Sequence, residues 1–201
     1  MLIIRKILSI LEYAKYKECF GGRVYYKMRK DFLCDYYRMT GKKWGGVKGF
    51  FWLLLRYDLR YLYLIRQRKT KLRTFFALRA ARKYGLEILS DNIGPGLYIG
   101  HAHNINVNPS TVIGKNCNLN KGCTLGKENR GVREGAPKLG DDVWIGTNST
   151  VVGNIHIGND VLIAPNAYVN FDVPDHSIVL GNPGTIIRKE NATESYITMR
   201  I

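Results

Sequence analysis

The stretch KLGDDVWIGTNSTVVGNIHIGNDVLIAPNAYV, residues 138–169, decides the fold of this chain. A large aliphatic residue recurs there at every sixth position, and Gly or Ala often follows it. The same six-residue spacing appears earlier in two runs, and the second run is shifted by two residues relative to the first. The spacing is interrupted over residues 126–138. The aliphatic positions are Ile93, Ile99 and Ile105, then Val107, Ile113, Leu119 and Leu125, and finally Leu139, Ile145, Val151, Ile157, Ile163 and Val169.

A period of six residues fits neither an amphipathic helix nor a long alternating strand, whose periods are about 3.6 and 2.0. It fits a short strand and a corner, repeated, with Gly, Asn and Asp allowing the turns. Such coils stack strand over strand and bury an aliphatic column that no single repeat buries alone. The pattern therefore predicts a repetitive β structure in the second half of the chain.

Three further segments accompany the repeat, and together they resemble a known family. They are GPGLYIGHAHNINVNP (94–109), TLGKENRGVREGAPKLGDDVWIG (124–146) and VPDHSIVLGNPGTIIRK (173–189). The combination resembles hexapeptide-repeat acyltransferases of the serine acetyltransferase-like branch, closest in character to O-acetyltransferases of polysaccharide biosynthesis. The resemblance implies a mainly β fold, with a left-handed parallel β-helix of about four coils over residues 86–187 and a C-terminal tail at 188–201.

The first 85 residues differ in composition from the rest. They hold 22 of the 31 Lys and Arg residues and five of the 16 acidic residues, a net charge of +17, whereas residues 86–201 sum to −2. Apolar and basic residues alternate with helical spacing in residues 2–18, 49–71 and 75–85, which predicts a basic, aromatic-rich α-helical region of three to five helices. Interleaved Tyr, Trp, Lys and Arg suit either contact with an anionic membrane surface or an oligomerisation and capping module for the β-helix.

His101 is the candidate general base, because histidine exchanges protons near neutral pH and the resembled family places its catalytic His in this context. There the His follows a repeat that begins Gly-x-Gly and precedes the two-residue shift, and Gly94 and Gly96 match that order. His103 is the alternative base. In the resembled family an acidic residue upstream orients the catalytic His. Glu87 corresponds to that residue if the alignment allows a deletion of one residue. Alternatively, Glu87 is an exposed residue at the junction of two domains and has no catalytic role.

The resemblance implies acetyl-CoA as the donor, bound in a groove between neighbouring subunits of a homotrimer. Backbone groups at the corners of the β-helix would bind the pantetheine amides of acetyl-CoA, and cationic side chains near its end would bind the phosphates. The alternative is that Gly and Ala at the corners only permit the chain to turn. The sequence has no Walker-type or dinucleotide-binding glycine loop, which argues against ATP and NAD, and no metal is expected. The candidate cofactor-binding residues are Gly126, Gly146, Thr147, Ala164, Pro165, Arg188 and Lys189.

The acceptor is inferred from three positions that lack polar side chains. Serine acetyltransferases carry Asp immediately before the catalytic His and Arg-His before the Pro-Lys of the loop, whereas this chain has Gly100 and Gly135-Ala136. Loss of these charge-assisted contacts weakens binding of a zwitterion unless Arg133 or Glu134 substitutes. We therefore expect a sugar acceptor in capsule, exopolysaccharide or lipopolysaccharide biosynthesis, with serine O-acetylation in cysteine biosynthesis as the alternative and a noncatalytic scaffold at a membrane surface as a second alternative.

The remaining composition bears on location and on the cysteines. Arg5 and Lys6 interrupt the apolar start of the chain and no small-residue cleavage site follows, so we expect a cytoplasmic protein, peripheral at the inner face of the membrane if the basic region binds lipid.

The four cysteines form no CxxC pair, which favours reduced, partly buried thiols. Because the positive charge is confined to residues 1–85 and no zinc-finger spacing or Arg-Gly-rich tract occurs, a nucleic-acid partner is not expected.

Overall fold

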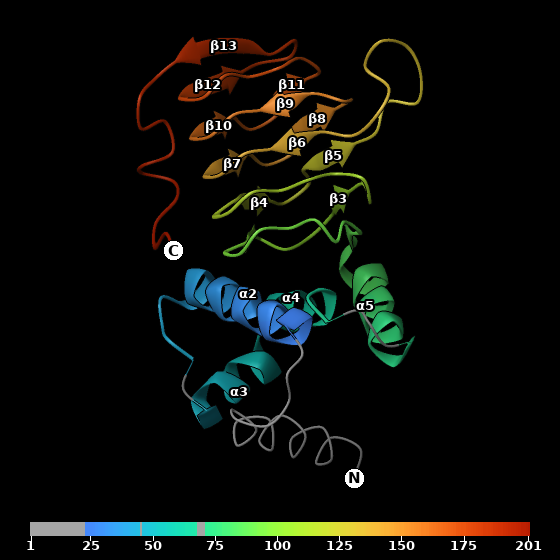
Figure 1. The fold of residues 1–201 in the computed structure, drawn as a ribbon, viewed down its shortest axis with the longest axis vertical. Coiled ribbons are helices and arrows are strands. Elements are labelled where there is room, and N and C mark those ends of the chain that lie inside the picture. Colours follow the sequence, from blue (N-terminus) through green and yellow to red (C-terminus); the bar gives the residue numbers. More distant parts are fainter. Residues whose placement is uncertain (1–22, 45, 68–70) are drawn as a thin grey trace.

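The structure, a computed structural model, describes residues 23–44, 46–67 and 71–201. Four helices gather at one end of the molecule and stacked strands build the rest (Figure 1). The expected fold class, a mainly β parallel β-helix preceded by helices, is confirmed. The described helices are α2 (Arg23–Thr40), α3 (Gly46–Leu55), α4 (Tyr57–Ile65) and α5 (Lys71–Tyr84).

The helices differ from the expected amphipathic patterns in two respects. α2 lies within the region predicted to be helical, but outside the three segments expected to form helices. The pattern expected to run from residue 49 to residue 71 is divided at Arg56, whose extended backbone (φ −103°, ψ 112°) separates α3 from α4. α4 packs against α2, α3 and α5, and its Leu59 and Leu62 side chains are completely buried. The helix expected at residues 2–18 lies outside the described residues.

The strands form three stacks of parallel strands, one for each face of a triangular solenoid. The first stack has the order β1-β3-β5-β8-β11, and the second β13-β12-β10-β7-β4-β2, in which only β13 is antiparallel. The third contains β6-β9 and is extended by single bridges such as Ile93 to Ile113 and Ile157 to Val173. The strands are β1 (Leu86–Ile88), β2 (Tyr98–Gly100), β3 (Ile105–Val107), β4 (Asn118–Asn120), β5 (Thr124–Gly126), β6 (Lys138–Leu139), β7 (Val143–Ile145), β8 (Thr150–Val152), β9 (His156–Ile157), β10 (Val161–Ile163), β11 (Tyr168–Val169), β12 (Ser177–Leu180) and β13 (Thr185–Arg188).

The aliphatic residues of the six-residue repeat form the core of the solenoid. Ile145, Val151, Ile157, Ile163 and Val169 have no exposed surface. Each such burial contributes about 1.5–3 kcal/mol of hydrophobic stabilisation relative to an exposed side chain. Backbone hydrogen bonds between successive coils satisfy the polar groups around this column.

A buried ion pair fastens the helical region to the first coil. The Asp35 carboxylate of α2 accepts two hydrogen bonds from Arg66, at 2.8 and 2.9 Å, and a third from the Leu97 backbone N–H at 2.8 Å. Arg66 also donates to the carbonyls of Ile93 and Gly94, at 2.6 and 2.7 Å. Neighbouring Tyr61 bridges α4 to β1 through the Leu86 carbonyl and the Ile88 N–H. The helices therefore cover the open end of the β-helix.

The C-terminal tail, residues 189–201, runs back along the outer face of the second stack toward the helices (Figure 1). Near its start the Thr193 N–H and hydroxyl donate to Asp160, at 2.9 and 2.7 Å. Further along, the Tyr196 ring packs on the Trp144 ring with their centroids 5.0 Å apart. The tail is thus part of the β-helix surface and links its last coils to its first.

We expect Asp35→Ala to lower the free energy of unfolding by about 3–5 kcal/mol, because it leaves the Arg66 guanidinium buried without a counter-charge. Urea denaturation followed by circular dichroism measures the change. Asp31→Ala, on the same helix but without an ion pair among the described residues, serves as the control and is expected to cost about 1 kcal/mol or less. Equal losses in the two variants would contradict this assignment.

Candidate functional site

His101 lies at the corner between the second and first stacks, immediately after β2. Its backbone is left-handed (φ 50°) and its side chain is exposed. The corner continues through the coils above it, because the Lys121 N–H donates to the Gly100 carbonyl at 2.9 Å and the Asn148 N–H donates to the Lys121 carbonyl at 3.0 Å. We call residues 100–101, 120–121, 146–147 and 164–165 the His101 corner.

The space beside Gly100 is occupied by a side chain of the next coil. A Cβ at this position would lie 2.1 Å from the Asn120 Oδ1 atom of the next coil. Asn120 is held there because its amide nitrogen donates to the Ile145 carbonyl at 2.7 Å. In this chain the amide of Asn120 therefore fills the space in which a side chain at position 100 would start.

The two candidate catalytic residues, His101 and Glu87, do not contact each other. Glu87 projects from β1, and its carboxylate accepts only a long hydrogen bond of 3.5 Å from the Asn106 amide. No hydrogen bond joins Glu87 to His101 among the residues that the structure describes. The alternative base, His103, packs against the rings of Tyr57 and Tyr84, with centroids 5.6 and 5.7 Å away.

The candidate cofactor-binding residues fall into three places. Gly146, Thr147, Ala164 and Pro165 all belong to the His101 corner, where Gly146 must be glycine because a Cβ would lie 2.5 Å from the Pro165 nitrogen. Gly126 ends β5 at the opposite end of the first stack, where the loop of residues 127–137 leaves the solenoid. Arg188 and Lys189 stand at the third corner, since the Arg188 guanidinium donates to the Ser177 hydroxyl at 3.4 Å and the Lys189 N–H donates to the His176 carbonyl.

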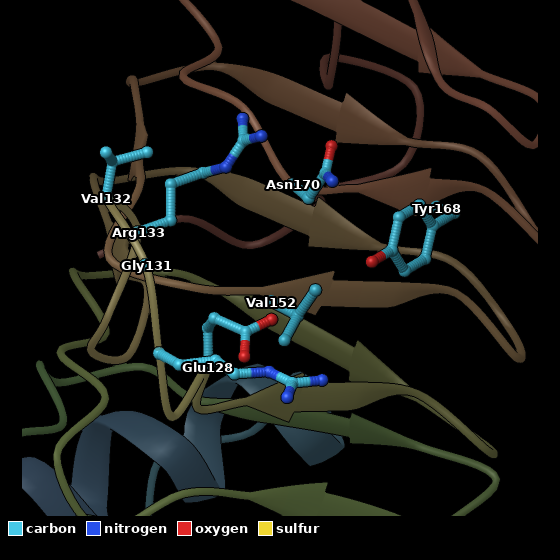
Figure 2. A pocket seen from close by; sticks show the side chains of 8 residues that line it. Glu128, Gly131, Val132, Arg133, Val152, Tyr168 and Asn170 are labelled. Atoms are coloured by element: carbon cyan, nitrogen blue, oxygen red, sulfur yellow. The ribbon is translucent and has the colours of Figure 1, made fainter.

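The loop folds back over the first stack and closes a pocket of about 230 Å³ against it (Figure 2). Charged and polar side chains from the loop face Val152, Tyr168 and Asn170 of the solenoid (Figure 2). The sequence predicts the loop but not this pocket, because Tyr168 and Asn170 come close to the loop only when it folds back. The lining residues are Glu128, Arg130, Gly131, Val132, Arg133, Val152, Tyr168 and Asn170; we call this the loop pocket.

Backbone pairing holds the loop in place. Glu128 and Gly135 exchange both of their backbone hydrogen bonds, at 2.9 and 3.0 Å, so the loop is pinched at its base. The Asn154 N–H donates to the Arg133 carbonyl at 2.9 Å, which ties the tip to the coil beneath it. Gly153 has a left-handed backbone (φ 98°), which favours glycine, and lies beside Arg133.

The described cysteines are buried or half-buried and free. Burial raises the pKa of the Cys117 and Cys123 thiols to about 12, so both stay protonated and unreactive at neutral pH. Cys19 lies outside the described residues. Across residues 23–44, 46–67 and 71–201 there is no group of three or more His, Cys, Asp or Glu side chains placed to hold a metal ion. No described helix is both long enough and apolar enough to cross a membrane.

Comparison with known proteins shows which proteins the repeat and most of the chain resemble. The hexapeptide pattern of bacterial transferases (six repeats) matches residues 136–170. Serine acetyltransferase 2 of Arabidopsis thaliana is 31% identical over 123 residues, which are 61% of this chain and 38% of that protein. The serine acetyltransferase of Staphylococcus epidermidis is 35% identical over 98 residues, 49% of this chain and 46% of that protein. This chain is similar to serine acetyltransferases.

Solved structures agree with the sequence comparison. The serine acetyltransferase of Neisseria gonorrhoeae in complex with serine superposes with a TM-score of 0.67 at 26% identity, covering 92% of this chain and 75% of that one. The soybean apoenzyme superposes with a TM-score of 0.64 at 26% identity, covering 80% and 69%. This chain spans less than half the length of the Arabidopsis and Staphylococcus relatives.

These findings correct the expected acceptor. The interpretation as a polysaccharide O-acetyltransferase is wrong, because the proteins similar to this chain in sequence and in structure are serine acetyltransferases. That interpretation depended on the apolar character of Gly100, Gly135 and Ala136 alone. Side chains of other coils fill the space beside both glycines, since a Cβ would lie 2.8 Å from the Asn154 Cβ at Gly135 and 2.1 Å from the Asn120 Oδ1 atom at Gly100.

Proposed function

We propose that this chain is an acetyl-CoA-dependent serine O-acetyltransferase. The main support is its superposition over 92% of its length on a serine acetyltransferase in complex with serine, together with an exposed histidine at a corner of the β-helix. The location proposed for such a protein is the cytoplasm. The domains proposed are the helical region 1–85, the acyltransferase β-helix 86–187 and the tail 188–201.

In this proposal His101 acts as the general base. It accepts the proton of the serine hydroxyl while the hydroxyl oxygen forms a bond to the acetyl carbon, and it returns the proton to the sulfur when the carbon–sulfur bond breaks. Acetyl-CoA supplies the acetyl group as a thioester. The transfer is direct, so no acetyl group becomes attached to the protein. The resemblance gives Glu87 the role of orienting His101; it lies on the neighbouring coil, where its carboxylate accepts a 3.5 Å hydrogen bond from Asn106.

The residues of the His101 corner fit an extended ligand with amide groups. Gly146 and Ala164 leave the corner without bulky side chains, and Thr147 offers a half-exposed hydroxyl. Gly126 borders the loop at the other end of the first stack. Arg188 and Lys189 lie about 10 Å away, a strand's length from the corner, so within one chain they are poorly placed to meet phosphates there.

We propose a homotrimer in which two chains complete each site. His101 lies at one end of the first stack and the loop pocket at the other, so one chain does not bring them together. A ring of three chains places one corner of each solenoid against the loop of the next. Sedimentation equilibrium of the full chain is therefore expected to give three times the mass of the monomer.

We expect the purified chain to release CoA from acetyl-CoA in the presence of L-serine, and His101→Ala to lower kcat by about 10²–10⁴-fold. A thiol-detection assay measures both. His103→Ala tests the alternative base, and His156→Ala, exposed on β9, is the matched control that leaves the rate unchanged. Full activity of His101→Ala would contradict the mechanism, and no release with serine would contradict the function.

We also propose that α3 contacts an anionic membrane. Its Phe51, Leu54 and Leu55 side chains are 58%, 43% and 77% exposed, and the exposed Lys48 lies on the same helix. The full chain is expected to float with phosphatidylserine vesicles at low salt and to be released at high salt, and Leu55→Glu to abolish flotation. Leu72→Glu on α5 is the control. No flotation of the unaltered chain would contradict this proposal.

A further inference from the structure

The loop pocket contains side chains of both signs that are not neutralised by one another. Glu128 is half-buried, whereas Arg130 and Arg133 are exposed at the pocket's edge. No ion pair joins Glu128 to either arginine, and neither arginine pairs with another carboxylate in the described part of the chain. Tyr168 and Asn170 add a hydroxyl and an amide on the solenoid side (Figure 2). Such a pocket is complementary to a small zwitterion, which carries one charge of each sign.

We infer that the loop pocket binds the amino-acid head of the acceptor, with Arg133 holding its carboxylate and Glu128 its ammonium group. The inference rests on the proposed serine acetyltransferase function and deepens it. It gives a source for the charges that Gly100, Gly135 and Ala136 cannot supply.

Side chains of other coils fill the space beside Gly100 and Gly135, so the charged groups that bind the acceptor are expected at other residues. The Asn120 amide fills the space beside Gly100, and Asn154 fills the space beside Gly135. A side chain at Gly135 would meet the Asn154 Cβ, and one at Gly100 would have to move the Asn120 amide. Ala136 is itself buried, at 6% exposed, so it does not line an open site. The loop, in contrast, places charged side chains of both signs at one pocket.

The loop presents Glu128 and Arg133 on the same side and holds both backbones still. An atom at the Cβ position of Gly153 would be 3.4 Å from the Arg133 Cβ and 3.8 Å from the Glu128 Cβ, so the two side chains start close together. The Asn129 N–H donates to Glu128 Oε1 at 2.9 Å, which orients that carboxylate and leaves its other oxygen available. Figure 2 shows the Arg133 guanidinium extending along the pocket toward Asn170.

The chemistry of the two groups predicts separate effects. A guanidinium forms a bidentate, charge-assisted pair with a carboxylate, and a carboxylate oxygen accepts a similar bond from an ammonium group. Acceptors that lack one of the charges therefore report on one residue at a time. Serinamide keeps the ammonium group without the carboxylate, and 3-hydroxypropanoate keeps the carboxylate without the ammonium group.

The test measures KM and kcat of the full chain for L-serine, serinamide and 3-hydroxypropanoate, with acetyl-CoA as donor. Arg133→Gln is expected to raise KM about 10–100-fold for serine and 3-hydroxypropanoate but not for serinamide. Glu128→Gln is expected to raise KM similarly for serine and serinamide but not for 3-hydroxypropanoate. Lys127→Gln, on the same loop but outside the pocket, is the control, and KM for acetyl-CoA is expected to stay unchanged in all variants.

The outcomes separate this inference from the proposed function. If the unaltered chain acetylates serine but Arg133→Gln changes all three KM values equally, or none, the inference is overturned and the function stands. If the unaltered chain does not acetylate serine, the proposed function fails, and calorimetric titration with L-serine then decides the inference. Serine binding that Arg133→Gln weakens supports the pocket, and no binding, or binding that the variant leaves unchanged, overturns it.

Discussion

The stacking of one coil on the next is the constraint on which the rest of this structure depends. Backbone pairing brings successive coils so close that a Cβ at Gly114 would lie 2.2 Å from the Gly140 carbonyl oxygen. The aliphatic column inside the solenoid favours this stacking, because each coil buries its side chains only against its neighbours. A side chain at Gly114 would therefore push the two coils apart.

This constraint decides where chemistry can be placed. At its corner His101 has a left-handed backbone (φ 50°) and an exposed side chain. Further charged side chains come from the segment that leaves the repeat, the loop of residues 127–137. The histidine and the loop pocket consequently occupy different corners of one chain. The fold thus favours a site that two chains build together.

The sequence was sufficient to predict the solenoid, since the period of six specifies both the strands and their inward residues. It was also sufficient to locate the loop that leaves the repeat. The break between α3 and α4 at Arg56 was not predictable, because both helices share one continuous amphipathic pattern. Nor was the crowding at Gly100, which depends on Asn120, twenty positions away in sequence and adjacent only after the coils have stacked.

The incorrect prediction of the acceptor has the same cause, which is a contact between segments that are far apart in sequence. Local reasoning treated three apolar positions as a loss of serine recognition, whereas the charges of Glu128 and Arg133 become a pocket only when the loop lies against Tyr168 and Asn170. A contact between segments so far apart in sequence has no periodic signature. Similarity to serine acetyltransferases supplied the correction that the pattern could not.

Complementation between two inactive variants tests the central claim, a site shared by two chains, most directly. His101→Ala and Arg133→Gln chains are denatured together, refolded, and assayed with serine well below the KM of the unaltered chain. Random mixing of two variants in a ring gives about a quarter of the sites both native groups, so activity is predicted to reappear at that level. Activity no higher than that of the separately refolded variants would contradict the account, because it would place both groups in a site within one chain.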